Sequence, residues 1–231
     1  KSTQLINIYL ALRDEGTEMA LIDLEDKLEA TLLSSGIPLP KSFFSPLSWE
    51  EYTEVVDKLL KEKQAWIGVD RVDLTWNMVQ RWFTRQRYNE ELSKRMLEKS
   101  KEMKKTSMFI PRFDQGSWQV INEAYESTMF KLLYASRCNV IMTAGIRGLD
   151  EDNPIDTFAR LGVAPRGQKE LSHQPHSVFL LFQKAKGKEV TWNITTAKDL
   201  PKREVFDEEQ LFDFHTQYVS KYEGFTHTSG R

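Results

Sequence analysis

The sequence predicts an α/β fold in which a mainly parallel sheet is flanked by helices. Three short apolar runs, at 19–24, 65–69 and 139–144, have the length and continuity of strands that are buried on both faces. Segments with helical spacing separate these runs, as expected for right-handed βαβ units. Two later apolar segments, 178–183 and 189–196, flank a short glycine-containing turn and predict an antiparallel hairpin at one edge of the sheet.

The helices are predicted from apolar periodicity and from capping residues. Residues 2–13 repeat apolar side chains on one face, and Gly16 is expected to end that helix. Ser48 is expected to cap the next helix, with Glu51 at the third position of a capping box. The remaining expectations are one long helix or a broken pair over 74–105, a helix over 117–137 with Val120 facing inward, a loop over 145–175, and a last helix from Asp207 through Tyr222. Residues 1–223 are taken as one domain and 224–231 as a flexible tail.

Composition excludes several classes of protein. The net charge of −2 gives no global attraction for a polyanion, so any nucleic-acid surface must be local. Cys138 is the sole cysteine, which precludes a disulfide within the chain and a cysteine-based zinc site, and we expect it to be a buried structural thiol. No apolar stretch approaches the roughly 20 residues of a membrane span, and no signal peptide opens the chain. These features predict a cytoplasmic protein that does not enter a membrane.

The first three residues, Lys1-Ser2-Thr3, match the end of the phosphate-binding motif G-x-x-x-x-G-K-[ST]. A charged chain end would carry the same residues, but two carboxylates farther along the chain favour the motif. Glu25 lies just after the first predicted strand, and Asp70 ends the second. Carboxylates at strand ends after such a helix are typical of a nucleotide hydrolase. We therefore expect Lys1, Ser2, Thr3 and Asp70 to bind ATP, with Ser2 and Asp70 as ligands of Mg²⁺.

Further residues are expected to act on the terminal phosphate. Glu25 is the candidate that orients or deprotonates the attacking water, in competition with Asp23 and Asp26. Thr143 ends the third predicted strand, where it would sense the γ-phosphate or simply cap the strand. Lys198, Lys202 and Arg203 follow a late strand and either complete a neighbouring subunit's site, as an arginine finger does, or form a basic surface loop.

In these segments the chain resembles the RecA-like core ATPases, particularly the phage- and archaea-associated branch near RadA and KaiC. The resemblance implies that Glu25 is the catalytic base, that Asp70 holds Mg²⁺, and that a basic residue among Lys198, Lys202 and Arg203 acts in trans in a homo-oligomer, a hexamer or a filament. It also implies that the loop 145–168 contacts DNA. The chain departs from the family because the motif's glycines and the strand before them, central in that fold, are not in the sequence. We therefore expect residues to precede Lys1 in the working protein.

The expected DNA-contacting residues lie in and just after the glycine-rich loop that follows the third strand: Arg147, Arg160, Arg166 and Lys169. A flexible surface loop is the alternative interpretation. The charged segment 85–105 favours a solvated helix laced with i,i+4 ion pairs, while its basic excess leaves contact with DNA or another subunit open. His173 and His176 are three residues apart, but no third ligand accompanies them, so a zinc site is not favoured.

Together these features predict a Mg²⁺-dependent ATPase that acts on DNA in recombination, strand annealing or repair, in a bacterial, archaeal or virus-infected cell. One alternative is a viral genome-packaging or other motor ATPase. Such motors usually place a glutamate directly after the strand-end aspartate, whereas Arg71 follows Asp70 here. The other alternative is a scaffold or clamp that kept the fold without hydrolysing nucleotide.

Overall fold

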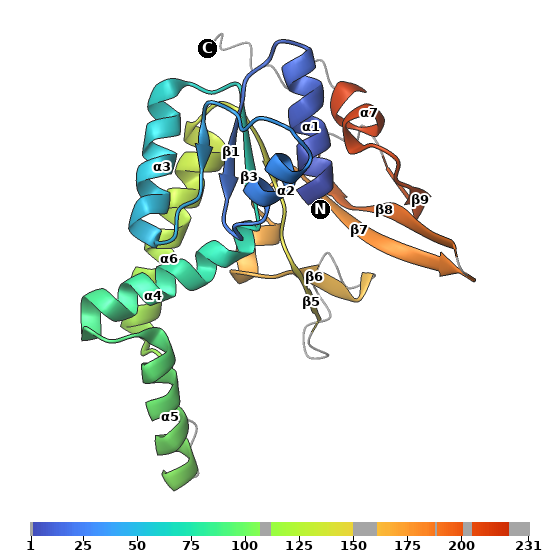
Figure 1. The fold of residues 1–231 in the computed structure, drawn as a ribbon. Coiled ribbons are helices and arrows are strands. Elements are labelled where there is room, and N and C mark those ends of the chain that lie inside the picture. Colours follow the sequence, from blue (N-terminus) through green and yellow to red (C-terminus); the bar gives the residue numbers. More distant parts are fainter. Residues whose placement is uncertain (1, 107–111, 150–160, 188, 201–204, 222–231) are drawn as a thin grey trace.

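A four-stranded parallel sheet forms the centre of the protein (Figure 1). The computed structural model describes residues 2–106, 112–149, 161–187, 189–200 and 205–221. The strands are ordered β2-β1-β3-β4, and their bounds are β1 (Met19–Asp23), β2 (Phe43–Phe44), β3 (Trp66–Asp70) and β4 (Asn139–Met142). This arrangement confirms the predicted mainly parallel sheet. Asp23 pairs in register with Asp70, so the acidic ends of β1 and β3 lie level at one edge of the sheet.

Helices cover both faces of this sheet. One face packs against α3 (Trp49–Glu62), α4 (Thr75–Tyr88) and α6 (Gln115–Phe130), the last continued by a π-helical turn at Lys131–Ala135. The other face packs against α1 (Ser2–Asp14), α2 (Leu28–Ser34) and the carboxyl-terminal elements. Ser48 caps α3 as predicted, because its side chain accepts the Glu51 N–H at 3.2 Å. The expectation that Val120 faces inward is wrong, since its side chain is exposed on α6.

Gly68 lets α1 lie directly against the sheet. It is in the middle of β3, and a Cβ atom there would lie 2.6 Å from Met19 Cε and 2.9 Å from Leu5 Cδ1. A larger residue there would force these side chains to move.

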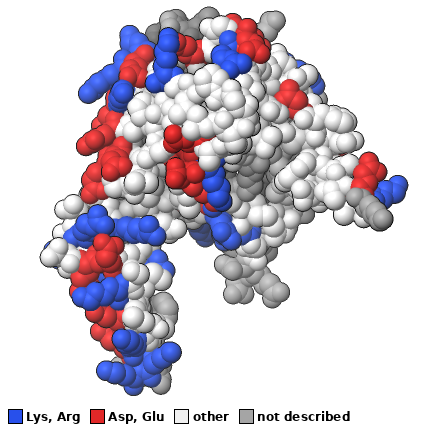
Figure 2. All heavy atoms as spheres, in the orientation of Figure 1, with Lys and Arg blue, Asp and Glu red and all other residues white. Residues whose placement is uncertain are grey.

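The segment 74–105 forms the broken pair of helices rather than one long helix. Asn89 ends α4 with a left-handed backbone (φ 52°), and α5 (Leu92–Thr106) then leaves in a new direction. Figure 1 shows α5 projecting away from the body of the protein. Basic and acidic side chains alternate along it in Figure 2, and basic atoms cluster at its far end.

The carboxyl-terminal part confirms the predicted antiparallel hairpin but neither its place at an edge of the parallel sheet nor the last helix, because the described strands of the hairpin belong to a separate sheet. The hairpin is β7 (Ser177–Lys186) with β8 (Glu189–Asp199), and β9 (Glu209–Gln210) extends it to three strands. The predicted helix from Asp207 to Tyr222 is wrong: the segment contains β9, the short α7 (Phe214–Gln217) and a 3₁₀ turn at Val219–Lys221. Asp213 starts α7 because its side chain accepts the His215 and Thr216 N–H groups. The tail 224–231 lies outside the described residues.

The region predicted to be a loop, 145–175, contains a two-stranded antiparallel ribbon where it is described. Its strands are β5 (Ile146–Gly148) and β6 (Val163–Pro165), and a 3₁₀ turn follows at Lys169–Ser172. Among the described residues no helix is both long and apolar enough to cross a membrane.

Candidate functional site

The carboxyl edge of the parallel sheet brings together residues that are far apart in the sequence. Ser2 Oγ, in the first turn of α1, donates a hydrogen bond to Asp70 Oδ2 at 2.7 Å. Thr143, which directly follows β4, donates its hydroxyl to Asp70 Oδ1 and accepts the Arg71 N–H at 2.9 Å. Asp70 is fully buried. Its carboxylate is therefore held by two hydroxyl groups from elements on either side of β3.

Arg71 directly follows Asp70, and its side chain binds two further carboxylates, those of Glu25 and Asp73. Its backbone is left-handed (φ 65°), which turns the chain sharply at the end of β3. Nη1 donates to Glu25 Oε1 at 2.7 Å, while Nε and Nη2 donate to the two oxygens of Asp73 at 2.9 and 3.0 Å. The hydrogen bond to Asp73 is the main reason that the pKa of Arg71 is raised, so the guanidinium stays charged.

Of the two carboxylates that the Arg71 side chain binds, Asp73 is buried more deeply than Glu25. Burial raises the pKa of Asp73, but hydrogen bonds from Arg71 and from the Gly145 N–H outweigh it and hold the pKa below its ordinary value. The Gly145 bond is 3.0 Å long and ties the start of the β5–β6 ribbon to the sheet edge. The cluster defined by Ser2, Glu25, Asp70, Arg71, Asp73, Thr143 and Gly145 is called the edge cluster below.

The structure separates the three acids that competed for the role of catalytic base. Asp23 is occupied as a local cap: its carboxylate accepts the N–H groups of Glu25, Leu28 and Glu29 at 3.1, 2.7 and 3.2 Å. Asp26 is exposed and has a left-handed backbone. Of the three acids, Glu25 belongs to the edge cluster because its carboxylate pairs with Arg71. It also pairs with Lys27 at 3.0 Å.

The other predicted nucleotide-site residues are placed differently. Thr3 is exposed in the first turn of α1. Lys198 lies on β8, where its amine donates to the carbonyl oxygens of His173 and Pro175 at 2.8 and 2.7 Å. Burial lowers the pKa of Lys198. Lys1, Lys202 and Arg203 lie outside the described residues.

The predicted DNA-contacting residues surround the ribbon next to the edge cluster. Arg147 is on β5, Lys169 begins the 3₁₀ turn after β6, and Arg160 lies outside the described residues. Arg166 donates its N–H to Gly145 O at 2.9 Å. A Cβ atom on Gly145 would lie 3.1 Å from both Arg166 Cδ and Asp73 Oδ2, so the Arg166 side chain passes close to the cluster.

Two residues of the edge cluster are not identifiable as site residues from the sequence. Arg71 directly follows Asp70, but its role depends on a left-handed turn that no motif announces. Asp73 looks like an ordinary helix-start acid, and its partners are Arg71 and the distant Gly145. The sequence signal that could have indicated them is that both charged residues, Arg71 and Asp73, come just after the buried strand β3.

The other candidate sites carry less chemistry. Within the described ranges, no group of three or more His, Cys, Asp or Glu side chains is arranged to hold a metal ion, and this covers His173 and His176. Cys138 is buried and free, and burial raises the pKa of its thiol, as expected for a structural cysteine.

Comparison with known proteins identifies neither a family nor a function for the chain. No protein-family model matches the chain, and no curated protein matches it significantly. The functional interpretation therefore depends on the geometry of the edge cluster.

Proposed function

We propose that the protein is a Mg²⁺-dependent ATPase of the RecA-like type, with the edge cluster as its catalytic centre. The observation that carries the proposal is the hydrogen bond between Ser2 and Asp70, which joins the start of α1 to the end of β3. A hydroxyl at a helix start beside a strand-end carboxylate is the pair that holds Mg²⁺ in P-loop enzymes. Both groups supply the oxygen atoms that Mg²⁺ prefers.

The residues present fit a magnesium ion that is shared with phosphate groups. Mg²⁺ is commonly bound by one or two carboxylates together with substrate phosphates and water, and Asp70 with Ser2 matches that pattern. The amino end of α1 also faces the same edge, where its free N–H groups favour an anion. In this proposal Lys1 neutralises phosphate charge.

Glu25 is the proposed base, and Arg71 controls it. The Arg71 guanidinium, 2.7 Å away, engages one oxygen of the Glu25 carboxylate. To orient water, Glu25 must exchange this contact for one with the nucleophile. Arg71 is then free to face the γ-phosphate, while Asp73 keeps the guanidinium near the edge through its two hydrogen bonds. Thr143 holds the Asp70 carboxylate in place on the opposite side.

Contact with DNA and assembly into an oligomer complete the proposal. Gly145 donates its N–H to Asp73 and accepts the Arg166 N–H, and Arg147 follows it on β5. A movement of Asp73 would therefore also move the backbone that carries these two basic side chains. Lys198 would have to leave two carbonyl groups to reach a neighbouring subunit's nucleotide. Lys202 and Arg203 stay candidates for that trans role.

The test is Mg²⁺·ATP binding measured by calorimetry. Lys1→Ala should abolish binding because the polyphosphate loses its main cation. Ser2→Ala should weaken it about tenfold, the equivalent of one charge-assisted hydrogen bond. Ser34→Ala, which removes an exposed hydroxyl at the end of α2, is the matched control and should leave binding unchanged. No binding by the parent polypeptide would favour the non-hydrolysing scaffold.

A further inference from the structure

Helix α5 is a described element to which the proposed catalytic centre gives no role. It projects from the body of the protein (Figure 1), and of its side chains from Leu92 to Lys105, Leu92 alone is buried. Its start is fixed by Arg95, whose guanidinium carbon lies 3.4 Å from the centre of the Tyr88 ring on α4. Most helices in proteins are stabilised by the packing of an apolar face. The presence of α5 therefore calls for a reason other than the core.

The net charge of α5 is opposite in sign to that of the whole chain. Its 15 residues include six lysine or arginine residues and two glutamates, so the helix carries +4, whereas the chain carries −2. The i,i+4 ion pairs expected for 85–105 do not form among the described residues. The pairs between described residues are Arg85 with Glu91 at 3.0 Å and Lys99 with Glu102 at 2.9 Å, which leave most of the positive charge of α5 uncompensated.

Three of the unpaired lysines share one face of α5. Lys94, Lys101 and Lys105 follow one another by seven and four residues, which places them on a single stripe, about 10 and 6 Å apart along the helix axis. All three side chains are exposed, and none has an ion-pair or hydrogen-bond partner among the described residues. Glu98 lies on the same stripe between Lys94 and Lys101. The three lysines are called the basic face below, and Figure 2 shows basic atoms gathered at the far end of α5.

The basic face lowers the stability of the helix that carries it. Lys94 is the third residue of α5, where the positive end of the helix dipole disfavours a cation, and no acidic residue stands in this first turn. Lys101 and Lys105 are four residues apart, and like charges at this spacing destabilise a helix. A negatively charged partner would remove both penalties, because it would neutralise cations that nothing else in the described part of the chain neutralises.

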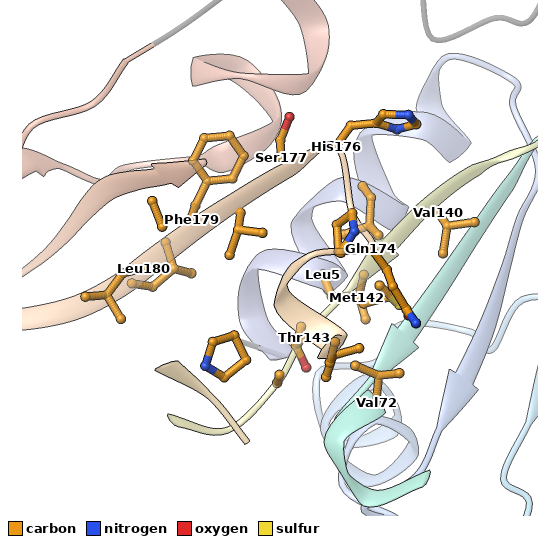
Figure 3. A pocket seen from close by; sticks show the side chains of 18 of the residues that line it. Leu5, Val72, Val140, Met142, Thr143, Gln174, His176, Ser177, Phe179 and Leu180 are labelled. Atoms are coloured by element: carbon orange, nitrogen blue, oxygen red, sulfur yellow. The ribbon is translucent and has the colours of Figure 1, made fainter. Parts of the chain in front are cut away.

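The apolar cavity between β4 and β7 is a separate feature. It has a volume of about 340 Å³. Val140 and Met142 line it from β4, and Phe179 and Leu180 line it from β7 (Figure 3). None of its described lining residues is a lysine, an arginine, an aspartate or a glutamate, and none comes from α5. The basic face is therefore a surface that is distinct from this cavity.

We propose that the basic face of α5 binds the phosphate backbone of double-stranded DNA, independently of base sequence and of nucleotide. Lysine side chains neutralise phosphates and release the counterions that surround them. Arginine, asparagine and glutamine, which read base edges through paired hydrogen bonds, are absent from this face. A helix of about 10–12 Å diameter also fits the major groove, which is about 12 Å wide, so exposed lysines along one stripe can reach successive phosphates.

The composition of α5 favours a double strand over a single strand and over a membrane. Proteins bind single-stranded nucleic acids with aromatic side chains on which the bases stack, and α5 contains no aromatic residue. Helices that lie in a membrane surface bury a broad apolar face that carries tryptophan, phenylalanine or leucine. On the side of α5 opposite to the basic face, Lys99 lies between Met96 and Met103, which places a charge in the middle of the apolar side chains.

Fluorescence anisotropy with a labelled duplex of about 30 base pairs, without nucleotide and over about 50–200 mM KCl, tests the proposal. The variant that carries Lys94→Gln, Lys101→Gln and Lys105→Gln should bind at least about tenfold more weakly at the lower salt concentration. Its slope of log affinity against log salt concentration should be shallower by about 2–3 units, close to one unit per lost phosphate contact. An unchanged slope would overturn the proposal, and so would a parent protein that does not bind the duplex. Because neither ATP nor the edge cluster takes part, the result is independent of the proposed catalytic centre.

Two further triple variants separate the basic face from positive charge in general. The matched control removes the same charge from exposed positions on other parts of the chain and should leave affinity and slope unchanged: Lys41→Gln, Lys61→Gln and Lys184→Gln. The charge-preserving variant should keep the slope of the parent: Lys94→Arg, Lys101→Arg and Lys105→Arg. A control that loses as much slope as the glutamine variant of the basic face, or an arginine variant that loses it too, would contradict the proposal.

Other ligands and the helix content decide between the remaining outcomes. Tighter binding of a single strand than of the duplex of equal length would contradict the assignment to double-stranded DNA. Vesicles of phosphatidylcholine and phosphatidylserine that bind the parent but not the glutamine variant, with DNA binding unchanged, would assign the basic face to a membrane and contradict the proposal. Circular dichroism should show equal helix content, since lysine and glutamine have similar helix propensities. Should the triple variant lose helix, Lys101→Gln alone must reduce the slope by about one unit.

Discussion

Replacing Thr143 with valine should destabilise the protein strongly, although the two side chains have nearly the same shape. The Thr143 hydroxyl donates to the fully buried Asp70 carboxylate and accepts the Arg71 N–H. Valine removes both bonds and leaves a buried anion and a backbone amide each short of one partner. The substitution therefore isolates the hydrogen bonds of the edge cluster from its packing.

The expected loss follows from these two bonds. A hydrogen bond to a charged group contributes about 1.5–3 kcal/mol to stability, and a buried group left without a partner costs about 1–3 kcal/mol. Because Arg71 is only partly buried, we take the lower end for its N–H group. The free energy of unfolding should fall by about 3 kcal/mol. With an m value of about 3 kcal/mol per M, this shifts the urea midpoint by about 1 M.

Urea denaturation followed by tryptophan fluorescence measures this shift, and Thr84→Val provides the matched control. Thr84 is fully buried, whereas Thr143 is partly buried, and the Thr84 hydroxyl donates to Gln80 O within a regular turn of α4. The control should lose less than about 1 kcal/mol. A Thr143→Val variant within about 0.5 kcal/mol of Thr84→Val would refute the argument that Thr143 holds Asp70.

Three further predictions concern catalysis, DNA and pH. Glu25→Gln should keep Mg²⁺·ATP binding but lower turnover about 100-fold or more, the scale of a general base; turnover within about twofold of the parent would remove Glu25 from that role. Neutralising Arg147, Arg160 and Arg166 together should reduce the slope of log affinity for DNA against log salt concentration by roughly one unit per lost phosphate contact, and an unchanged slope would place DNA elsewhere. Asp73→Asn should lower the free energy of unfolding at neutral pH. Because the pKa of Asp73 in the folded protein lies below the ordinary value of 3.8, this loss should be complete above about pH 4 and should shrink as the pH falls through the folded pKa. A loss that does not change with pH would show that the charge of Asp73 is not what stabilises the protein.

The sequence was sufficient to predict the parallel core of the fold. Buried parallel strands are short continuous apolar runs, so β1, β3 and β4 were found from hydrophobicity alone. The short strands β2, β5, β6 and β9 were missed because two or three residues are too few to show a period. The last helix was predicted wrongly since the periodicity of 207–222 did not reveal that Glu209 and Gln210 pair with β8.

The site was predictable where it depends on strand ends and not where it depends on backbone turns. Asp70 and Glu25 follow apolar runs, and parallel strands bring their carboxyl ends to one edge, so their approach could be expected. Arg71 contacts Glu25 only because its left-handed backbone directs the side chain back toward β1. No propensity or spacing encodes that turn, and Asp73 is recognised only once the turn is known.

Paramagnetic broadening by Mn²⁺·ATP tests the proposed catalytic centre most directly. Mn²⁺ accepts the same oxygen ligands as Mg²⁺ and broadens NMR signals near its own position. We expect broadening of the amide signals of Ser2, Glu25, Asp70 and Thr143 when Mn²⁺ and ATP are both present, and its loss in Ser2→Ala. Broadening that is absent, or that centres on residues away from the carboxyl edge of the sheet, would contradict the proposed function.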